Sequence, residues 1–169
     1  PGAPAHTPTA VAAPDFADRL VTLTAATKTF NIAGAHIGNA IITDPALRDR
    51  YKGRLMALGI SPGLFGLPMV TAAYSPEGAE WVDALRTYVG KNARIFDDGL
   101  ARIPGAKSMK LQSTYLAWVD FSGMGLSAED LHRRIEGQAR IAANHGESFG
   151  LGGECWMRFN LATPSARVH

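Results

Sequence analysis

The stretch that decides the fold surrounds one lysine near the start of the chain. It reads Thr24-Ala25-Ala26-Thr27-Lys28-Thr29-Phe30-Asn31-Ile32-Ala33-Gly34. Residues 20–24 alternate in character and predict a short strand that leads into Lys28. A lysine at the mouth of a strand suits covalent catalysis through its amine, which must be partly desolvated to lose its proton near neutral pH. A solvated surface lysine is the alternative, and it is the common state of this residue type.

The composition bounds the function classes. The chain has 169 residues, a net charge of +2, and 46% hydrophobic and 19% charged residues. This is ordinary for a globular protein and indicates neither a nucleic-acid-binding nor a polybasic membrane surface. The single cysteine, Cys155, allows no internal disulfide and predicts a reducing, cytoplasmic location. Residues 1–14 lack the pattern of a signal peptide and predict an extended linker.

A second short strand is predicted over 36–42, and helical patterns fill the middle of the chain. Asp44 and Pro45 predict a helix start, with the aspartate as the N-cap and the proline in the first turn. Ser61-Pro62 predicts the start of the next helix. Apolar residues at helical spacing then predict one long helix over 77–102, which suits a connector between two lobes; a simple core helix is the alternative.

The last third of the chain mixes strand and helix patterns. Strands are predicted over 114–121 and 155–161. Between them, a helix is predicted from an N-cap at Ser127 to a stop at residues 144–146. The glycines that follow, up to Gly153, predict a flexible turn with positive φ angles.

Arg158 is the second candidate site residue. Alternation along the last strand places it with Trp156 and Asn160, away from the apolar face. A guanidinium in that position can hold a carboxylate with its planar fork. The alternative is a solvated arginine on an edge strand.

Other site chemistries have little support in the sequence. The histidines form no HxH or HxxxH pair, so no metal site is predicted. The glycines near 146–153 do not follow a strand and open a helix, as phosphate-binding loops do. No GxSxG elbow is present, and Cys155 has no basic neighbour in sequence, which favours a small buried residue over a nucleophile.

Three segments resemble motifs of a known family. They are the lysine segment, the strand segment from Gln112 to Asp120, and the closing segment Phe149-Gly-Leu-Gly-Gly-Glu-Cys-Trp-Met-Arg158-Phe-Asn-Leu-Ala-Thr-Pro164. Together they resemble fold-type-I pyridoxal-phosphate (PLP) enzymes, in the aminotransferase class I/II branch that includes the cystathionine β-lyase-like C–S lyases. The resemblance covers nearly all of the chain and implies the C-terminal half of such an enzyme.

The resemblance implies an α/β fold in three parts. Residues 1–75 would be the end of a large, mostly parallel-sheet domain that binds PLP. Residues 76–104 would be the connecting helix, and residues 105–169 a small α+β domain. The family is usually homodimeric, so a homodimer is expected, with no nucleic-acid or membrane partner.

The resemblance also implies roles for four residues. Lys28 would form the Schiff base with PLP and act as the general base at the substrate Cα, and Arg158 would bind the substrate α-carboxylate. Thr24 and Thr27 could supply hydroxyls to the cofactor phosphate. Two positions depart from the pattern: Ala25 stands where many relatives carry a phosphate-binding serine, and His36 where many aminotransferases carry an arginine.

The predicted function is therefore a PLP-dependent aminotransferase or C–S β-lyase that acts on an amino acid. The sequence leaves transamination and β-elimination open, with a slight preference for the lyase. The alternative is a catalytically incompetent fragment or structural lobe that needs the missing N-terminal half. In the family that half supplies the phosphate loop, the aromatic ring on the pyridine and the carboxylate at the pyridine nitrogen.

Overall fold

The computed structural model describes residues 5–169. The contacts divide them into two compact units, residues 5–84 and residues 85–169. Helix α4, Pro76–Leu100, contributes its first turns to one unit and its remainder to the other. The long helix predicted over 77–102 is thus confirmed, although it begins one residue and ends two residues earlier. The division into a large and a small domain stays a prediction.

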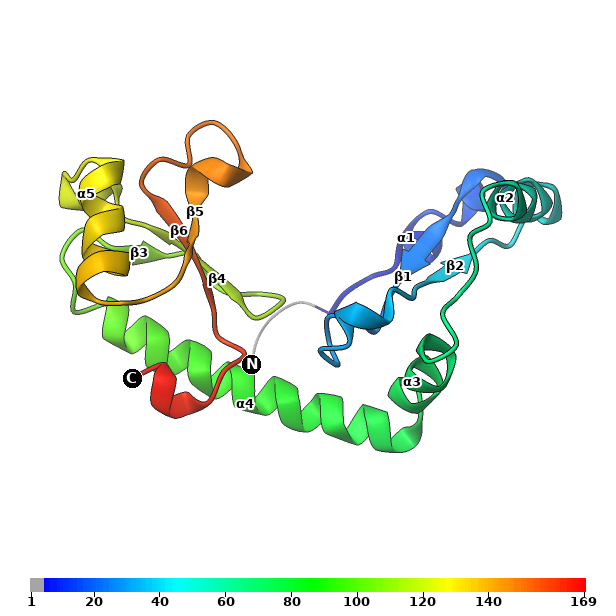
Figure 1. Ribbon diagram of the computed structural model, residues 1–169, viewed down its shortest axis with the longest axis horizontal. Coiled ribbons are helices and arrows are strands. Elements are labelled where there is room, and N and C mark those ends of the chain that lie inside the picture. The colour runs from blue at the N-terminus through cyan, green and yellow to red at the C-terminus, as the bar shows by residue number, and fades with distance from the viewer. Residues whose placement is uncertain (1–4) are drawn as a thin grey trace. The chain divides into compact units, whose positions relative to one another are not determined.

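The unit over residues 85–169 is built on a four-stranded antiparallel sheet (Figure 1). In spatial order its strands are β3 Lys107–Ser108, β4 Leu116–Asp120, β6 Trp156–Asn160 and β5 Asn144–His145. The strands predicted over 114–121 and 155–161 are confirmed as β4 and β6, which pair along their whole length. Because β6 lies between β4 and β5, Arg158 is on an interior strand and not on an edge.

The hydrophobic core of this unit lies on one face of the sheet. Alternate residues of β4 and β6 point into it, as the period of a strand requires. Helix α4 and the short helix α5, Ala128–His132, cover the same face. The buried core residues are Leu100, Ala117, Val119, Phe121, Leu131, Met157, Phe159 and Leu161. The other face of β4 and β6 carries Trp118, Trp156 and Arg158, which are all half-buried.

The predicted helix after Ser127 is only partly right. It begins as expected, because the Asp130 amide donates to Ser127 Oγ at 3.1 Å and satisfies one of the free donors at a helix start. It then widens into a π-helical segment, Arg133–Gln138, and ends there. The predicted stop at residues 144–146 is wrong, since Asn144–His145 forms the strand β5 through its pairing with β6.

The glycine-rich connection is more ordered than predicted. Gly146–Phe149 forms a 3₁₀ turn, and Gly146 and Gly153 are both buried against each other. The positive φ angles are confirmed at Gly150 and Gly152, with values of 137° and 86°. Beyond β6 the chain ends in a short 3₁₀ turn, Ser165–Arg167, which runs along α4 (Figure 1, red and green).

The unit over residues 5–84 combines a two-stranded ribbon with helices. Strand β1, Thr22–Thr24, pairs antiparallel with β2, Asn39–Ile41. Helices α2, Pro45–Ala57, and α3, Gly66–Ala73, follow. Parallel pairing, expected for the large domain, is not found among the strands of residues 5–84.

Several local predictions in this unit can be checked. The N-cap at Asp44 is confirmed, since its Oδ1 accepts a hydrogen bond from the Leu47 amide at 2.7 Å. The strand predicted over 36–42 is shorter, because His36 has a φ of 45°, which belongs to the left-handed region and not to a strand. Helix α3 begins at Gly66 and not at Ser61-Pro62, because the turn closes from the Gly66 amide to the Gly63 carbonyl.

The start of the chain is helical where an extended linker was predicted. Thr9–Ala12 forms the short helix α1, and Pro14–Arg19 forms a 3₁₀ turn. Residues 1–4 of that predicted linker lie outside the described residues. Among residues 5–169, no helix combines the length and apolar character that crossing a bilayer requires.

Burial differs between the two units. Of the described hydrophobic residues in 5–84, only Ala26, Ile42 and Ala73 are buried. Large apolar side chains on β1, β2, α2 and α3, and on the segment just before α3, are instead exposed, and they include Leu23, Ile41, Met56, Leu64, Phe65 and Leu67. Residues 85–169 therefore contain a closed core, whereas residues 5–84 do not.

Candidate functional site

Lys28 lies in a hydrogen-bonded turn directly after β1. The Phe30 amide donates to the Ala26 carbonyl at 3.0 Å, and the Ile32 amide donates to the Thr27 carbonyl at 2.9 Å. The turn reverses at Asn31, which has a φ of 54°, a conformation that asparagine adopts more readily than most residues. Ala26 anchors the turn by being buried.

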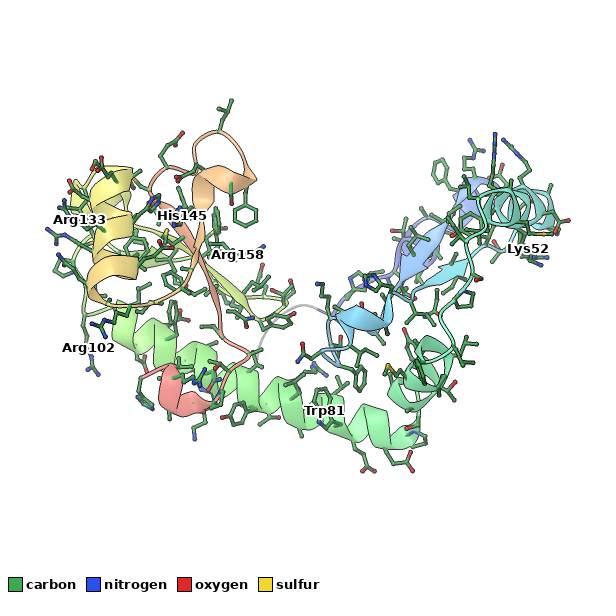
Figure 2. All side chains as sticks on the ribbon, in the orientation of Figure 1. Lys52, Trp81, Arg102, Arg133, His145 and Arg158 are labelled. Carbon is green, nitrogen blue, oxygen red and sulfur yellow. The ribbon has the colours of Figure 1, made fainter. Side chains whose placement is uncertain are left out.

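The side chain of Lys28 is exposed within the described residues. The desolvation that an unprotonated lysine amine requires is therefore not provided by residues 5–84. An aromatic contact stabilises the turn. Phe30 stacks on Trp81 of α4 with 5.1 Å between ring centroids and 22° between ring planes. Figure 2 labels Trp81 on α4.

The two threonines near Lys28 occupy different positions. Thr24 is the last residue of β1 and is exposed, and Thr27 lies in the turn and is half-buried. Both lie within four residues of the lysine in the sequence. The two residues that depart from the family pattern, Ala25 and His36, are both exposed.

Arg158 is held by two residues of the segment that precedes β6. Asn144 is its partner in the β5–β6 register, and Arg158 Nη2 donates to Asn144 Oδ1 at 3.1 Å. The guanidinium carbon of Arg158 lies 4.4 Å from the ring centroid of Phe149, a cation–π distance. Figure 2 labels Arg158 on this sheet.

The Nε of Arg158 is buried and has no hydrogen-bond partner among the described residues. A buried donor without a partner costs about 1–3 kcal/mol, so native structures rarely leave one. A carboxylate supplied by a ligand would balance the charge and could accept hydrogen bonds from the terminal N–H groups of the guanidinium. The arrangement thus favours the ligand-binding interpretation of Arg158 over a solvated arginine.

Aromatic rings surround Arg158 on its face of the sheet. Trp118 stacks on Trp156 with 5.6 Å between centroids, and it meets the edge of Phe149 at 5.4 Å. Trp118 is also the cross-strand partner of Arg158. These contacts place a positive group in partly apolar surroundings, where a charged ligand is bound more strongly than in open water.

Sequence reasoning missed Asn144 and Phe149. The sequence predicts a helix stop at residues 144–146, and it indicates Phe149 only as the first residue of the closing motif. The pairing of Asn144 with Arg158 depends on a strand register between positions distant in the sequence, which no local pattern reveals. Lys28 and Arg158, the two main predicted residues, lie in different units, and the structure describes each unit by itself.

A group of potential metal ligands lies on the helix-covered face of the same sheet. It consists of His132, His145 and Glu147, with His145 labelled in Figure 2. The two imidazole rings stack at 3.6 Å with 18° between planes, so their in-plane lone pairs run nearly parallel and do not converge on one point. His145 Nε2 is also engaged by Glu136 Oε1 at 2.8 Å. This group is therefore a stacked pair with flanking carboxylates.

An open groove of about 490 Å³ lies on the unit over residues 5–84. It is lined by Val21, Leu47, Arg50, Tyr51, Gly53, Arg54 and Ala57. None of the four predicted site residues lines it.

Solved structures resemble this chain closely. Cystalysin from Treponema denticola, whose crystal structure contains PLP, aligns with a TM-score of 0.89 and 33% identity over 99% of this chain and 43% of its own. The PLP-bound C–S lyase from Staphylococcus hominis aligns with a TM-score of 0.81 and 27% identity over 98% of this chain and 42% of its own. These neighbours confirm the α/β, fold-type-I class predicted from the sequence.

Sequence relatives point the same way. Cystathionine beta-lyase PatB of Bacillus subtilis is 40% identical over 96% of this chain and 42% of its own length, and protein MalY of Escherichia coli is 32% identical over 86% and 38%. The chain thus spans about two-fifths of the length of these relatives. Residues 2–168 match the family model for aminotransferase class I and II. By this match over nearly its whole length, the chain belongs to the aminotransferase class I and II family.

Proposed function

We propose that this chain is the part of a PLP-dependent enzyme that carries the cofactor lysine and the carboxylate-binding arginine. The enzyme would act on an amino acid and cleave a Cβ–S bond, as the names of the relatives PatB and the C–S lyase from Staphylococcus hominis suggest. Lys28 would be the catalytic residue, Thr24 and Thr27 would bind the cofactor, and Arg158 would bind the substrate.

The observation that carries the proposal is the state of Arg158. Its guanidinium is held from one side by a neutral amide and from one face by an aromatic ring, and neither contact cancels its charge. Such a group is prepared for a planar anion of the size of a carboxylate. Every amino-acid substrate carries one.

The residues around Lys28 fit PLP. A primary amine on a hydrogen-bonded turn can hold the cofactor covalently, and the hydroxyls of Thr24 and Thr27 can donate to its phosphate. When bound, PLP supplies an electron sink for charge that develops at the substrate Cα. Lys28 would take the Cα proton with its amine, and Arg158 would fix the carboxylate, so that the Cα–H bond faces that amine.

Transamination is the second candidate reaction. It uses the same lysine and arginine and differs in whether the proton returns to the substrate–cofactor framework or a group leaves from Cβ. The matching relative LL-diaminopimelate aminotransferase of Aquifex aeolicus keeps this candidate open. Its identity to this chain is 26%, against 40% for PatB, which favours the lyase.

The third candidate is a structural lobe that is inactive without its missing half. It is supported by the large apolar side chains that residues 5–84 expose, among them Leu64 and Phe65, because contiguous apolar surface usually marks an interface. The same surface supports the proposed homodimer. The proposed cytoplasmic location rests on Cys155, which forms no disulfide bond and therefore fits a reducing compartment.

The test is selective labelling of the lysine. The purified 169-residue chain is incubated with PLP, reduced with borohydride and digested, and the modified peptide is located by mass spectrometry. A preformed site predicts the adduct on Lys28, with Lys52, which is exposed on α2, as the internal control. Equal labelling of both lysines would support the inactive-lobe candidate for this chain.

A second assay separates the reactions. The full-length gene product, loaded with PLP, is given L-cystathionine, and pyruvate is measured against formation of the amino form of the cofactor. The proposal expects pyruvate. The amino form without pyruvate would assign the protein to the transaminases.

A further inference from the structure

We propose that Asn144 and Phe149 are positioning residues that hold the Arg158 guanidinium in the orientation in which it receives a substrate carboxylate. The inference rests on the proposed function for its biological meaning, and on contacts around Arg158 for its evidence. It assigns a role to the strand β5 and to the 3₁₀ turn after it, neither of which was expected from the sequence to touch the site.

Asn144 fixes one end of the guanidinium. It stands opposite Arg158 in the ladder, and its Oδ1 accepts one of the five N–H donors of the arginine. The partner is a neutral amide, so the contact orients the group without cancelling its charge. An aspartate at this position would form an internal ion pair and compete with an incoming carboxylate.

Phe149 fixes the plane of the guanidinium. Its ring lies 4.4 Å from the guanidinium carbon and packs in a T-shaped arrangement with Trp118. About half of the Phe149 side chain remains exposed, so the apolar burial of this residue is incomplete. Its contact with Arg158 therefore accounts for its position better than core packing does.

The backbone closes the turn that carries Phe149. Gly146 and Gly153 lie so close that a Cβ on either would overlap the other's backbone, and both are buried. This contact brings the two ends of the turn together beside β6. Phe149 is thus presented by a closed loop and does not rely on a mobile one.

The consequence concerns binding energy. A free arginine side chain loses rotamer freedom when it is immobilised, and a ligand must offset that loss. Asn144 and Phe149 impose the order before the substrate arrives. They should therefore lower KM and leave the proton transfer at Cα, and hence kcat, nearly unchanged.

The kinetic test uses the full-length gene product loaded with PLP and assayed with L-cystathionine. We expect Asn144→Asp to raise KM at least about 10-fold with kcat within about 2-fold, because the internal ion pair competes with the carboxylate. We expect Phe149→Leu to raise KM about 3- to 10-fold and Phe149→Tyr, which keeps the ring, to restore it. Leu151→Ala, at the fully exposed tip of the same loop, is the matched control and should change neither constant.

A structural role alone would give another pattern. Asn144→Asp would then leave KM unchanged, or would lower kcat together with the amount of folded protein, and Phe149→Tyr and Phe149→Leu would behave alike. Either result would overturn the inference. A wild-type protein that does not turn over L-cystathionine would instead defeat the proposed function, and the inference would be decided by the second measurement.

That measurement needs no activity. In the 169-residue chain, the NMR order parameter of the Arg158 Nε–H vector is compared with that of Arg134, which is exposed. Arg158 should be the more ordered residue in the wild type and in Leu151→Ala, and should approach Arg134 in Phe149→Leu. Equal mobility in the wild type, or no change in Phe149→Leu, would refute the positioning role.

Discussion

Asn92 on α4 reaches the carbonyl of Leu161, the residue that follows β6, with its Nδ2 donating at 2.9 Å. The same amide donates to Thr163 at 2.8 Å, and its Oδ1 accepts from Ser165 Oγ at 2.7 Å. Asn92 has 0% of its surface exposed, although its side chain is polar. It ties the segment after β6, and therefore the strand that carries Arg158, to the helix beneath the sheet.

Replacing Asn92 by alanine should lower the free energy of unfolding of residues 85–169 by about 3 kcal/mol. The change removes three hydrogen bonds and leaves buried carbonyls without a donor, each at a cost of about 1–3 kcal/mol. Urea denaturation in a Trp81→Phe background measures it, because the remaining fluorescence comes from Trp118 and Trp156 in this unit.

The control for Asn92 is Ser165→Ala, which removes only the bond to the amide oxygen. It should cost about 1 kcal/mol. If both variants lost the same stability, the two carbonyl contacts of Asn92 would carry no weight. The tie between α4 and the chain after β6 would then rest on packing alone.

Two glycine substitutions should change stability in opposite directions. Gly146→Ala places a Cβ against the Gly153 carbonyl and the backbone of Trp156, so it should destabilise the unit by about 2–4 kcal/mol. Gly99→Ala, in α4 with open space around it, should stabilise by about 0.5–1 kcal/mol, since glycine is the poorer helix former. Thermal denaturation of both variants checks the contrast, and a tolerated Gly146→Ala would mean that the loop opens freely.

Much of the fold could be predicted because its signals are local. The Asp44-Pro45 start, the Ser127 cap and the alternation that buries Met157 and Phe159 each depend on neighbours in sequence. What could not be predicted depends on distant partners. Strand β5 has two residues with no strand pattern of their own and exists because Arg158 and Met157 offer a free edge.

The candidate site shows the same contrast between local sequence signals and contacts with distant partners. Lys28 and Arg158 were found through motifs, which are continuous in the sequence. The support around Arg158 was missed because Asn144 reaches it only through the register of β5 and β6. The stacking of His132 on His145 was also missed, because a helix residue and a strand residue meet there without any regular spacing in sequence.

Removing the ring beneath the lysine turn should loosen that turn. In Trp81→Ala, Phe30 loses its stacked partner, and the local stability of the turn should fall by about 1–2 kcal/mol. The amides of Phe30 and Ile32, both hydrogen-bonded within the turn, should then exchange with solvent roughly 5- to 30-fold faster. Trp81→Phe keeps an aromatic ring and should exchange almost like the wild type; unchanged exchange in Trp81→Ala would show that the turn is held by its backbone alone.

The start of α4 should respond to acid in a defined way. The backbone amide of Glu77 and the Ser75 side chain hold the pKa of the Glu77 carboxyl below its ordinary value of 4.5. A carboxyl whose pKa is lowered by folding stabilises the folded state above its unfolded pKa, and that contribution is lost as the pH falls through the folded pKa. The difference in stability between the wild type and Glu77→Gln should therefore be present at neutral pH and vanish in acid.

Ser75→Ala separates the two causes of that pKa shift. It should raise the pKa of Glu77 part of the way toward 4.5, because the backbone hydrogen bond, which is the larger cause, remains. It should also cost about 1 kcal/mol even in acid, because Ser75 Oγ no longer accepts the Gly78 amide that it meets at 3.1 Å. The cost should be larger at neutral pH, where the ionised Glu77 carboxylate also loses its hydrogen bond with Ser75. A carbon-detected NMR titration of the Glu77 carboxyl measures the first effect and denaturation at two pH values the second. A pKa of Glu77 that does not move in Ser75→Ala would assign the whole shift to the backbone of α4.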